Sequence, residues 1–206
     1  MNNTLATKFV IDISDWQESL DFDEVIKEGV KGVIIKISEG TMYTDNLWHF
    51  VDACKEYNLP MGFYCYSHAT MVEEAIDEAM EVAYLLSTLD IEDSDIKLGI
   101  WYDVEAAEMF ESGVDTTAIC SAFICTLNNL KYTNVGIYTS SLKCTDYMVN
   151  SIRPNLLDDY VPFWIADYRG FNEFVHTYPN KHCSGWQYDP HGNIGGVEVD
   201  LNEWYD

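Results

Sequence analysis

The sequence predicts a single α/β domain built as an irregular TIM-like barrel, (β/α)5(β)3, in which five β/α units are followed by three further strands. Two observations support this prediction. Short, nearly continuous apolar runs recur along the chain, and helical patterns separate the first five of them. A length of 206 residues fits one domain with a substantial core. Because no linker or low-complexity segment interrupts the chain, we assign residues 1–206 to one domain.

Five runs rich in β-branched and aromatic residues are typical of parallel strands covered on both faces. They occupy residues 9–14, 32–38, 61–67, 98–105 and 135–140. Helical patterns lie between them at residues 23–28, 48–55, 72–89 and 116–130. This alternation of strand and helix predicts a parallel sheet or barrel.

The longest helical pattern, residues 72–89, has apolar residues at a 3.6-residue period. These are Val72, Ala75, Ile76, Ala79, Met80, Ala83 and Tyr84. Acidic residues along a helix usually form its solvated face. We expect that of Glu73, Glu74, Asp77, Glu78 and Glu81.

The last third of the chain is organised differently. Apolar runs at residues 161–167, 183–188 and 197–201 follow at closer spacing, and little helical pattern separates the last two. They bring the predicted number of strands to eight, with the last three joined mainly by loops.

The composition excludes several kinds of partner. Thirty-five acids against 11 bases give a net charge of −24, and a field of that sign repels nucleic acid and anionic membranes. No stretch approaches the roughly 18 apolar residues that span a bilayer. Residues 1–8 lack a basic end followed by a long apolar run, so we expect synthesis in the cytoplasm without a secretion signal.

Cysteine usage gives no sign of a metal or disulfide framework. The six cysteines include no Cys-x-x-Cys pair, and we expect reduced thiols that pack as small hydrophobes. Cys65 and His68 are two potential ligands, which is too few for a site. The chain also lacks the glycine-rich phosphate loops of nucleotide-binding proteins, so neither a metal nor a cofactor is expected.

The functional site of a parallel α/β barrel lies at the C-terminal ends of its strands. There the sequence supplies acids and aromatic rings with few bases, which is typical of a sugar-binding cleft. The candidate site residues are Asp12, Glu39, Tyr64, Tyr66, Asp103, Glu105, Tyr138, Trp164, Asp167, Trp186 and Asp200. His68, at the same edge, is expected to be a packed rim histidine.

Asp103 and Glu105 are the most informative pair. Residues i and i+2 of a strand point to the same side, with Cβ atoms roughly 6–7 Å apart. Two carboxylates so close resist ionising together, and a proton retained on one of them is what glycosidic cleavage requires. Alone, an Asp-x-Glu pattern could mark an exposed strand end. Here it follows an apolar strand whose neighbours also end in acids and aromatic rings.

Other candidates keep two interpretations. Asp12 lies inside an apolar run, so it either faces a polar barrel mouth or is a paired structural anchor, and the same holds for Asp200. Glu39 could shape a turn before Gly40. Trp164 and Trp186 could be core residues.

Taken in order, eight segments resemble glycoside hydrolase family 25, the muramidase class of lysozymes common in bacteriophage endolysins and bacterial autolysins. They are IDISDWQ at 11–17, ISEGT at 37–41, GFY at 62–64, WYDVE at 101–105, GIYT at 136–139, FWIA at 163–166, GWQY at 185–188 and VDLN at 199–202.

The resemblance implies a flattened barrel of five β/α units and three further strands. It also implies cleavage of the β-1,4 bond from N-acetylmuramic acid to N-acetylglucosamine in bacterial peptidoglycan. Glu105 matches the general acid, Asp103 its partner that orients the substrate's acetamido group, and Asp12 and Asp200 two further active-site acids. A substrate-assisted attack, a direct nucleophile and an inverting water all stay open at this point. No metal is implied.

One segment departs from the family. The third strand reads Tyr64-Cys65-Tyr66, where the family often has a Tyr-His-Phe type of run, so contacts at the rim are expected to differ. Two other functions remain: a module that holds wall glycan without cutting it, and a glycosidase for another N-acetylglucosamine polymer. The net charge also leads us to expect a wall-binding domain beyond Asp206. The missing secretion signal leads us to expect a phage lysin that is released through a holin.

Overall fold

Eight strands close into a barrel because the first strand pairs on both of its sides. In the computed structural model, which describes residues 7–205, β1 (Thr7–Ile13) runs parallel to β2 (Val33–Glu39) and antiparallel to β9 (Val197–Tyr205). The order around the barrel is β1-β9-β8-β7-β6-β5-β4-β2, and a two-residue strand, β3 (Met42–Tyr43), extends β2 outside it. The other strands are β4 (Met61–Tyr66), β5 (Ile96–Asp103), β6 (Val135–Ser140), β7 (Phe163–Ala166) and β8 (Cys183–Ile194).

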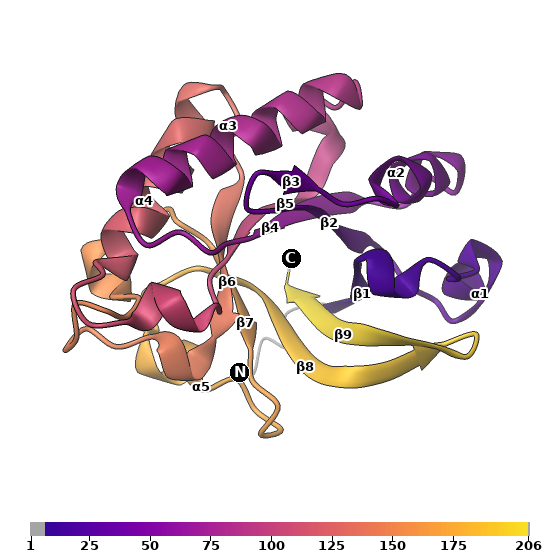
Figure 1. The fold of residues 1–206 in the computed structure, drawn as a ribbon. Helices are drawn as coiled ribbons and strands as arrows, with labels where there is room; N and C mark the ends of the chain where they lie inside the picture. Colours follow the sequence, from indigo (N-terminus) through magenta and orange to yellow (C-terminus); the bar gives the residue numbers. More distant parts are fainter. Residues whose placement is uncertain (1–6, 206) are drawn as a thin grey trace.

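Helices cover the outside of this barrel (Figure 1). They are α1 (Phe22–Lys27), α2 (Leu47–Glu56), α3 (Val72–Thr88), α4 (Thr116–Asn129) and α5 (Glu173–Thr177). α3 and α4 pack side by side on one flank. The side chain of Asp115 caps α4 by accepting a hydrogen bond from the Ala118 amide.

The predicted closed barrel of eight strands is confirmed, but no α-helix lies in the described segment between β6 and β7, where the chain forms only the 3-10 helices η4 (Ser141–Lys143) and η5 (Pro154–Leu156). Three further features were not predicted. β3 and α5 are too short to leave a clear sequence pattern. The last two strands are longer than predicted and form one antiparallel hairpin. Its two-residue turn is Gly195-Gly196, and both glycines have positive φ, which suits the twist of a tight hairpin.

One face of α3 differs from the prediction. Glu78, expected among the solvated acids, is buried, whereas the apolar Met80 and Tyr84 are exposed. The buried face is rotated toward Val82, Leu85 and Leu86. Glu78 turns inward because it accepts hydrogen bonds from Tyr102 Oη at 2.6 Å and Ser67 Oγ at 2.8 Å. The expectation of a solvated Glu78 was therefore wrong.

Two apolar layers hold the barrel. The larger lies between strands and helices, and the smaller fills the barrel interior. The smaller layer consists of Val10, Ile34, Leu98, Trp101, Tyr138, Trp164, Ala166 and Trp204. The rings of Trp101 and Trp204 meet edge-on, with centroids 5.4 Å apart. Interior and exterior residues alternate along β1 and β2, as the period of a strand requires.

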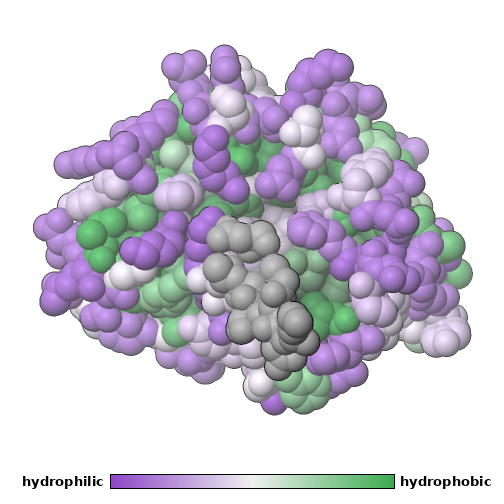
Figure 2. All heavy atoms as spheres, turned by 180° about the vertical axis from the view of Figure 1, so that it is seen from behind, coloured by the Kyte–Doolittle hydropathy of each residue, from purple (hydrophilic) through white to green (hydrophobic). Residues whose placement is uncertain are grey.

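Polar and charged residues dominate the face shown in Figure 2, where apolar residues lie in small patches between them. This agrees with the acidic composition. Within residues 7–205, no helix is both long and apolar enough to span a membrane.

Candidate active site

The acids of the site stand directly above the apolar interior of the barrel. Along β1, Asp12 follows Val10 on the inward face, and along β5, Asp103 follows Trp101 in the same way. β9 runs in the opposite direction, so Asp200 lies at the same end of the barrel and pairs directly across from Asp12. Strand periodicity thus brings carboxylates from three strands to one mouth.

Two buried amides link the acids of β1 and β9. The Gln187 amide donates to Asp12 Oδ2 at 3.0 Å and to Asp200 Oδ2 at 3.1 Å. Asn202 Nδ2 also donates to Asp12 Oδ2, at 2.8 Å. On its other side, Gln187 Oε1 accepts hydrogen bonds from the hydroxyls of Tyr138 and Tyr168. These bonds fix the orientation of both carboxylates and of the Tyr138 ring.

Asp103 and Glu105 differ in their surroundings. Asp103 is 4% exposed, and its buried Oδ1 has no hydrogen-bond partner among the described residues. Glu105 is half-buried and accepts no hydrogen bond from residues 7–205. Backbone bonds hold the turn between them: the Val104 amide donates to the Tyr138 carbonyl at 2.9 Å, and Thr139 Oγ1 donates to the Val104 carbonyl at 2.7 Å.

Burial raises the pKa of every acid in this group. The pKa values of Asp12 and Asp103 lie well above their usual range, and the charge of Glu105 raises both further. Burial raises the pKa of Asp200 to about 6. It also raises the pKa of Glu105, which the Lys143 charge lowers in part. The site therefore retains protons at a pH where exposed carboxylates have lost theirs.

A cavity of about 460 Å³ opens beside these acids. Asp12, Tyr64 and Asp200 form part of its wall, together with Glu198 from β9. Trp16 stands at its edge with 89% of its side chain exposed. An exposed indole beside buried carboxylates gives the cavity one apolar face against which a flat sugar ring can stack.

Of the three tyrosines expected at the site, Tyr64 and Tyr66 lie toward the barrel mouth, whereas Tyr138 belongs to the interior layer. Tyr64 faces the cavity and meets Trp164 edge-on, with ring centroids 6.2 Å apart. Burial and the charges of Asp103 and Glu105 raise the pKa of Tyr66. Tyr138 is held by Gln187.

Trp164, Asp167 and Trp186 have structural partners instead. Trp164 is 1% exposed in the barrel interior, and its indole N–H donates to Asn202 Oδ1 at 2.7 Å. Asp167 is bonded by Arg169 and Ser141, and the Arg169 bonds lower its pKa to about 2. The Trp186 indole donates to the Asp167 carbonyl at 2.7 Å. Of the two interpretations of Trp164, the structure therefore supports the core residue.

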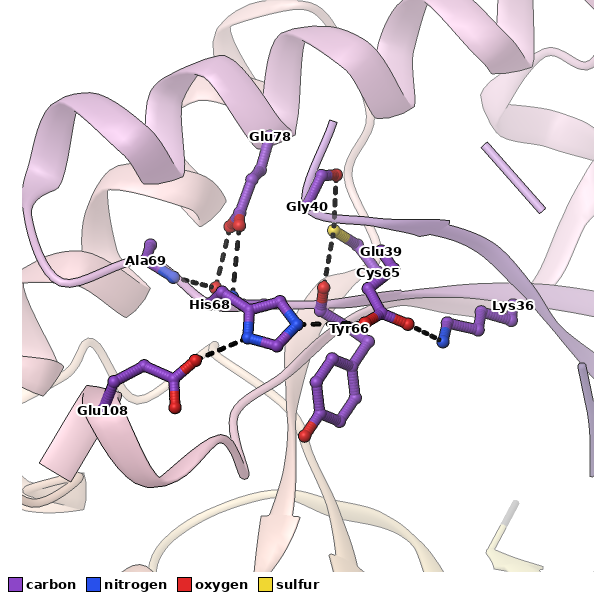
Figure 3. Close-up of polar contacts among 10 residues, drawn as sticks. Lys36, Glu39, Gly40, Cys65, Tyr66, His68, Ala69, Glu78 and Glu108 are labelled. Atoms are coloured by element: carbon purple, nitrogen blue, oxygen red, sulfur yellow. Dashed lines mark hydrogen bonds and ion pairs between the residues drawn. The ribbon is translucent and has the colours of Figure 1, made fainter. Parts of the chain in front are cut away.

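At the rim between β2 and β5, Glu39 forms part of a chain of ion pairs (Figure 3). Its carboxylate lies 2.6 Å from Lys36 Nζ and 3.0 Å from His68 Nε2. The other ring nitrogen of His68 lies 2.6 Å from Glu108. His68 packs edge-on against the Tyr66 ring, as expected of a rim histidine, and is in addition bonded to a carboxylate on each side. Glu39 contacts other rim residues in addition to preceding the turn at Gly40.

Sequence reasoning missed Gln187 as a site residue and did not assign Lys36 a role. The sequence contained a signal for Gln187, because it is a polar residue within a run predicted to be a strand. In the structure its side chain is 1% exposed. Lys36 follows Ile34 on the inward face of β2, and its charge lowers the pKa of Asp103. A buried amide or amine above an apolar layer requires partners, and here these are the acids.

The thiols are free throughout the described part of the chain. Cys54, Cys65 and Cys120 are buried, as expected, but Cys125 is exposed. Burial raises the pKa of Cys54 to about 12. Among residues 7–205, no three His, Cys, Asp or Glu side chains are arranged to hold a metal ion.

Comparison with known sequences identifies the family. Residues 11–197 match glycosyl hydrolases family 25. An autolytic lysozyme of Clostridium acetobutylicum is 30% identical over 199 residues, which are 94% of this chain and 55% of the lysozyme. The chain thus spans about half the length of this curated relative.

Solved structures share the fold. The modular autolysin LytC of Streptococcus pneumoniae superposes with a TM-score of 0.77 at 24% identity, over 97% of this chain and 47% of the autolysin. The catalytic domain of a Listeria monocytogenes bacteriophage endolysin gives a TM-score of 0.71 at 22% identity, over 98% and 94% of the two chains. A family match over nearly the whole described barrel, supported by this shared fold, shows that the chain belongs to family 25 of the glycosyl hydrolases.

Proposed function

We propose that this chain hydrolyses the β-1,4 bond between N-acetylmuramic acid and N-acetylglucosamine in bacterial peptidoglycan. The observation that carries the proposal is the group of four acids with raised pKa values at the barrel mouth, of which Asp12 and Asp200 line an open cavity. Membership of family 25 and the similarity to an autolytic lysozyme support the substrate class.

Glu105 is the proposed general acid. It is the member of the group that is half-buried and has no internal hydrogen bond, so its proton is available to a bound substrate. Burial raises its pKa, which keeps the proton in place until the glycosidic oxygen takes it as the C1–O bond breaks. Water then adds to the sugar carbon and gives up a proton to the Glu105 carboxylate, which restores the acid.

Asp103 is the proposed partner of this step. Its Oδ1 has no hydrogen-bond donor within the described residues, so it is an acceptor for a donor that the substrate brings, such as the acetamido N–H. Asp12 and Asp200 are held by amides that cannot themselves change charge. We propose that Asp200, whose pKa of about 6 leaves it ionised near neutral pH, stabilises the positive charge developing on the sugar ring.

Substitution of the acid tests the proposal. Glu105→Gln keeps the shape of the side chain but removes the proton, and we expect the release of soluble fragments from purified peptidoglycan to fall by about 10²–10⁴-fold. Glu111→Gln, an exposed acid in the following loop, is the matched control and should keep parental activity.

Two results would contradict the proposal. Equal activity of Glu105→Gln and the parent would remove Glu105 from the reaction. Retained glycan binding with no cleavage by the parent, across several wall types, would indicate a binding module instead.

A further inference from the structure

His68 connects the end of β2 with the segment that follows Glu105. It follows β4, and both of its ring nitrogens face carboxylates from other elements (Figure 3). Nε2 lies 3.0 Å from Glu39 at the end of β2, and Nδ1 lies 2.6 Å from Glu108. Glu108 belongs to a short 3-10 helix, η3 (Ala107–Phe110), which begins two residues after Glu105.

The two contacts define the charge of the ring. A neutral imidazole has one N–H group and donates to one acceptor, whereas the imidazolium cation donates from both nitrogens. Hydrogen bonds from Lys36 and His68 lower the pKa of Glu39, and the hydrogen bond from His68 lowers the pKa of Glu108, so both are ionised acceptors. The geometry at His68 is therefore that of the cation.

The surroundings favour this cation. His68 is flanked by groups from β2, β4, α3 and η3, and its backbone amide donates to Glu78. The titratable and charged groups that face it are Lys36, Glu39, Tyr66, Glu74, Asp77, Glu78 and Glu108. Lys36 is the one cation in this set, and it is bonded to Glu39.

η3 is anchored on its other side by neutral hydrogen bonds. Thr116 Oγ1 donates to the Met109 carbonyl, and Asn150 Nδ2 donates to the Phe110 carbonyl, each at 2.6 Å. Toward β2 and β4, η3 is held by the Glu108–His68 contact. Because Glu105 has no hydrogen bond within the described residues, its direction follows from the backbone between β5 and η3.

We propose that His68, as the imidazolium cation, is a positioning residue for Glu105, because it holds η3 against the end of β2 and packs edge-on against the Tyr66 ring. The ring centroids of His68 and Tyr66 are 5.1 Å apart. His68 lies two residues after the Tyr64-Cys65-Tyr66 run, the segment expected to change contacts at the rim. Its effect on hydrolysis rests on the function proposed above, whereas its effect on η3 does not.

The proposal predicts a pH dependence with a defined sign. Hydrogen bonds to Glu108 and Glu39 raise the pKa of His68, so the cation persists to a higher pH than in a free histidine. The double contact is lost as the pH rises through that raised pKa. We expect kcat to fall there by about twofold to fivefold, which is the effect of losing one exposed ion pair.

Two variants separate charge from shape. His68→Gln removes the cation. We expect its kcat to be reduced by the same factor at every pH, so that the fall in kcat attributed to His68 disappears from the pH profile. His68→Lys keeps a cation with several donors. We expect its kcat to stay near the value of the parent at low pH, with no fall in kcat at the pKa of His68. His49→Gln, an exposed histidine on α2, is the control and should keep the parental profile. kcat on purified peptidoglycan fragments is measured from pH 5 to 9.

NMR titration of the free protein supplies a readout that does not depend on hydrolysis. The imidazole of His68 and the backbone amides of residues 107–110 should titrate together in the parent, and these amides should not titrate in His68→Lys. The proposal would be overturned if the chemical shifts of these amides did not change as His68 titrates. Parental kcat in His68→Gln, or a loss in His68→Lys equal to that in His68→Gln, would also overturn it. If the parent cleaves no peptidoglycan, the proposed function fails while the amide titration still decides the role of His68.

Discussion

Desolvation is the main influence on each acid at the barrel mouth, and neighbouring charges add to it. At Asp103, burial and the charge of Glu105 raise the pKa well above its usual range, and the buried Oδ1 has no donor among residues 7–205. Asp167 shows the opposite case, because bonds from Arg169 lower its pKa to about 2 although its side chain is buried. Burial therefore raises the pKa of a carboxyl group unless strong hydrogen bonds or an opposite charge compensate for the lost hydration.

Asp200 gives a stability prediction at this scale. Its pKa rises from 3.8 to about 6 on folding, so the folded state binds its proton more tightly than the unfolded state. The associated stability is present below about pH 3.8 and is lost as the pH rises through about 6. Asp200→Asn does not titrate and still accepts from Gln187. A pKa rise of this size corresponds to roughly 3 kcal/mol for a fully buried group. Because Asp200 is only partly buried, we expect Asp200→Asn to raise the free energy of unfolding at pH 7.5 by about 1–2 kcal/mol.

Urea unfolding at pH 4 and pH 7.5 measures this difference. The gain of Asp200→Asn over the parent should be small at pH 4 and develop fully by pH 7.5. Asp52→Asn, exposed on α2, is the control. A gain that is the same at both pH values would show that Asp200 carries no such penalty.

At the scale of elements, the apolar runs predicted the barrel because parallel strands covered on both faces need continuous β-branched and aromatic residues. The direction of β9 was not predictable in this way, since parallel and antiparallel strands share the same residues. It follows from the Gly195-Gly196 turn, which reverses the chain within two residues. That reversal puts Asp200 opposite Asp12 and brings Gln187 between them.

The acids of the site could be predicted from the sequence, but most of their hydrogen-bond partners could not. Asp103 and Glu105 are two residues apart in sequence, so their proximity was predictable, although β5 ends at Asp103 and Glu105 lies in the segment after it rather than on the predicted strand. The partners of Asp12, by contrast, come from β8 and β9 at the far end of the chain. Trp164 was assigned to the cleft because it follows the sugar-site pattern, yet its position in register with Tyr138 puts it in the barrel interior.

α3 shows how tertiary partners override helical periodicity. The apolar residues on α3 allow two overlapping faces, and the hydroxyls of Ser67 and Tyr102 select the one that buries Glu78. Burial raises the pKa of Glu78, although the hydrogen bonds from Tyr102 and Ser67 lower it in part. Because Tyr102 precedes Asp103 on β5, this contact ties the helix to the strand that carries the acids.

Two substitutions of Glu78 should have different effects on the free energy of unfolding. Glu78→Gln keeps an acceptor for both hydroxyls and removes a buried charge, so we expect the free energy of unfolding at pH 7 to stay within about 1 kcal/mol of the parent. Glu78→Ala leaves the buried Tyr102 hydroxyl without its acceptor and should cost about 1–3 kcal/mol. Asp77→Ala, exposed on the same helix, is the control, and equal losses for Gln and Ala would contradict this account of α3.

At the scale of the whole molecule, the barrel concentrates its proton-retaining acids at one end while polar residues cover the outside. The net charge of −24 adds to the electrostatic potential that keeps protons on the acids of the cleft. It also opposes approach to an anionic wall, and this repulsion weakens as salt shortens the Debye length. Productive contact with a wall therefore depends on short-range binding in the cleft, where Trp16 and Tyr64 line the cavity.

Identification of the new chain ends in digested peptidoglycan tests the central claim most directly. Purified peptidoglycan is digested, reduced with borohydride and analysed by mass spectrometry, with Glu105→Gln in parallel. The account predicts reduced muramic acid at the new ends with the parent and none with the variant. Reduced glucosamine ends would contradict the proposed bond, and muramic acid ends produced equally by both proteins would contradict the role of Glu105.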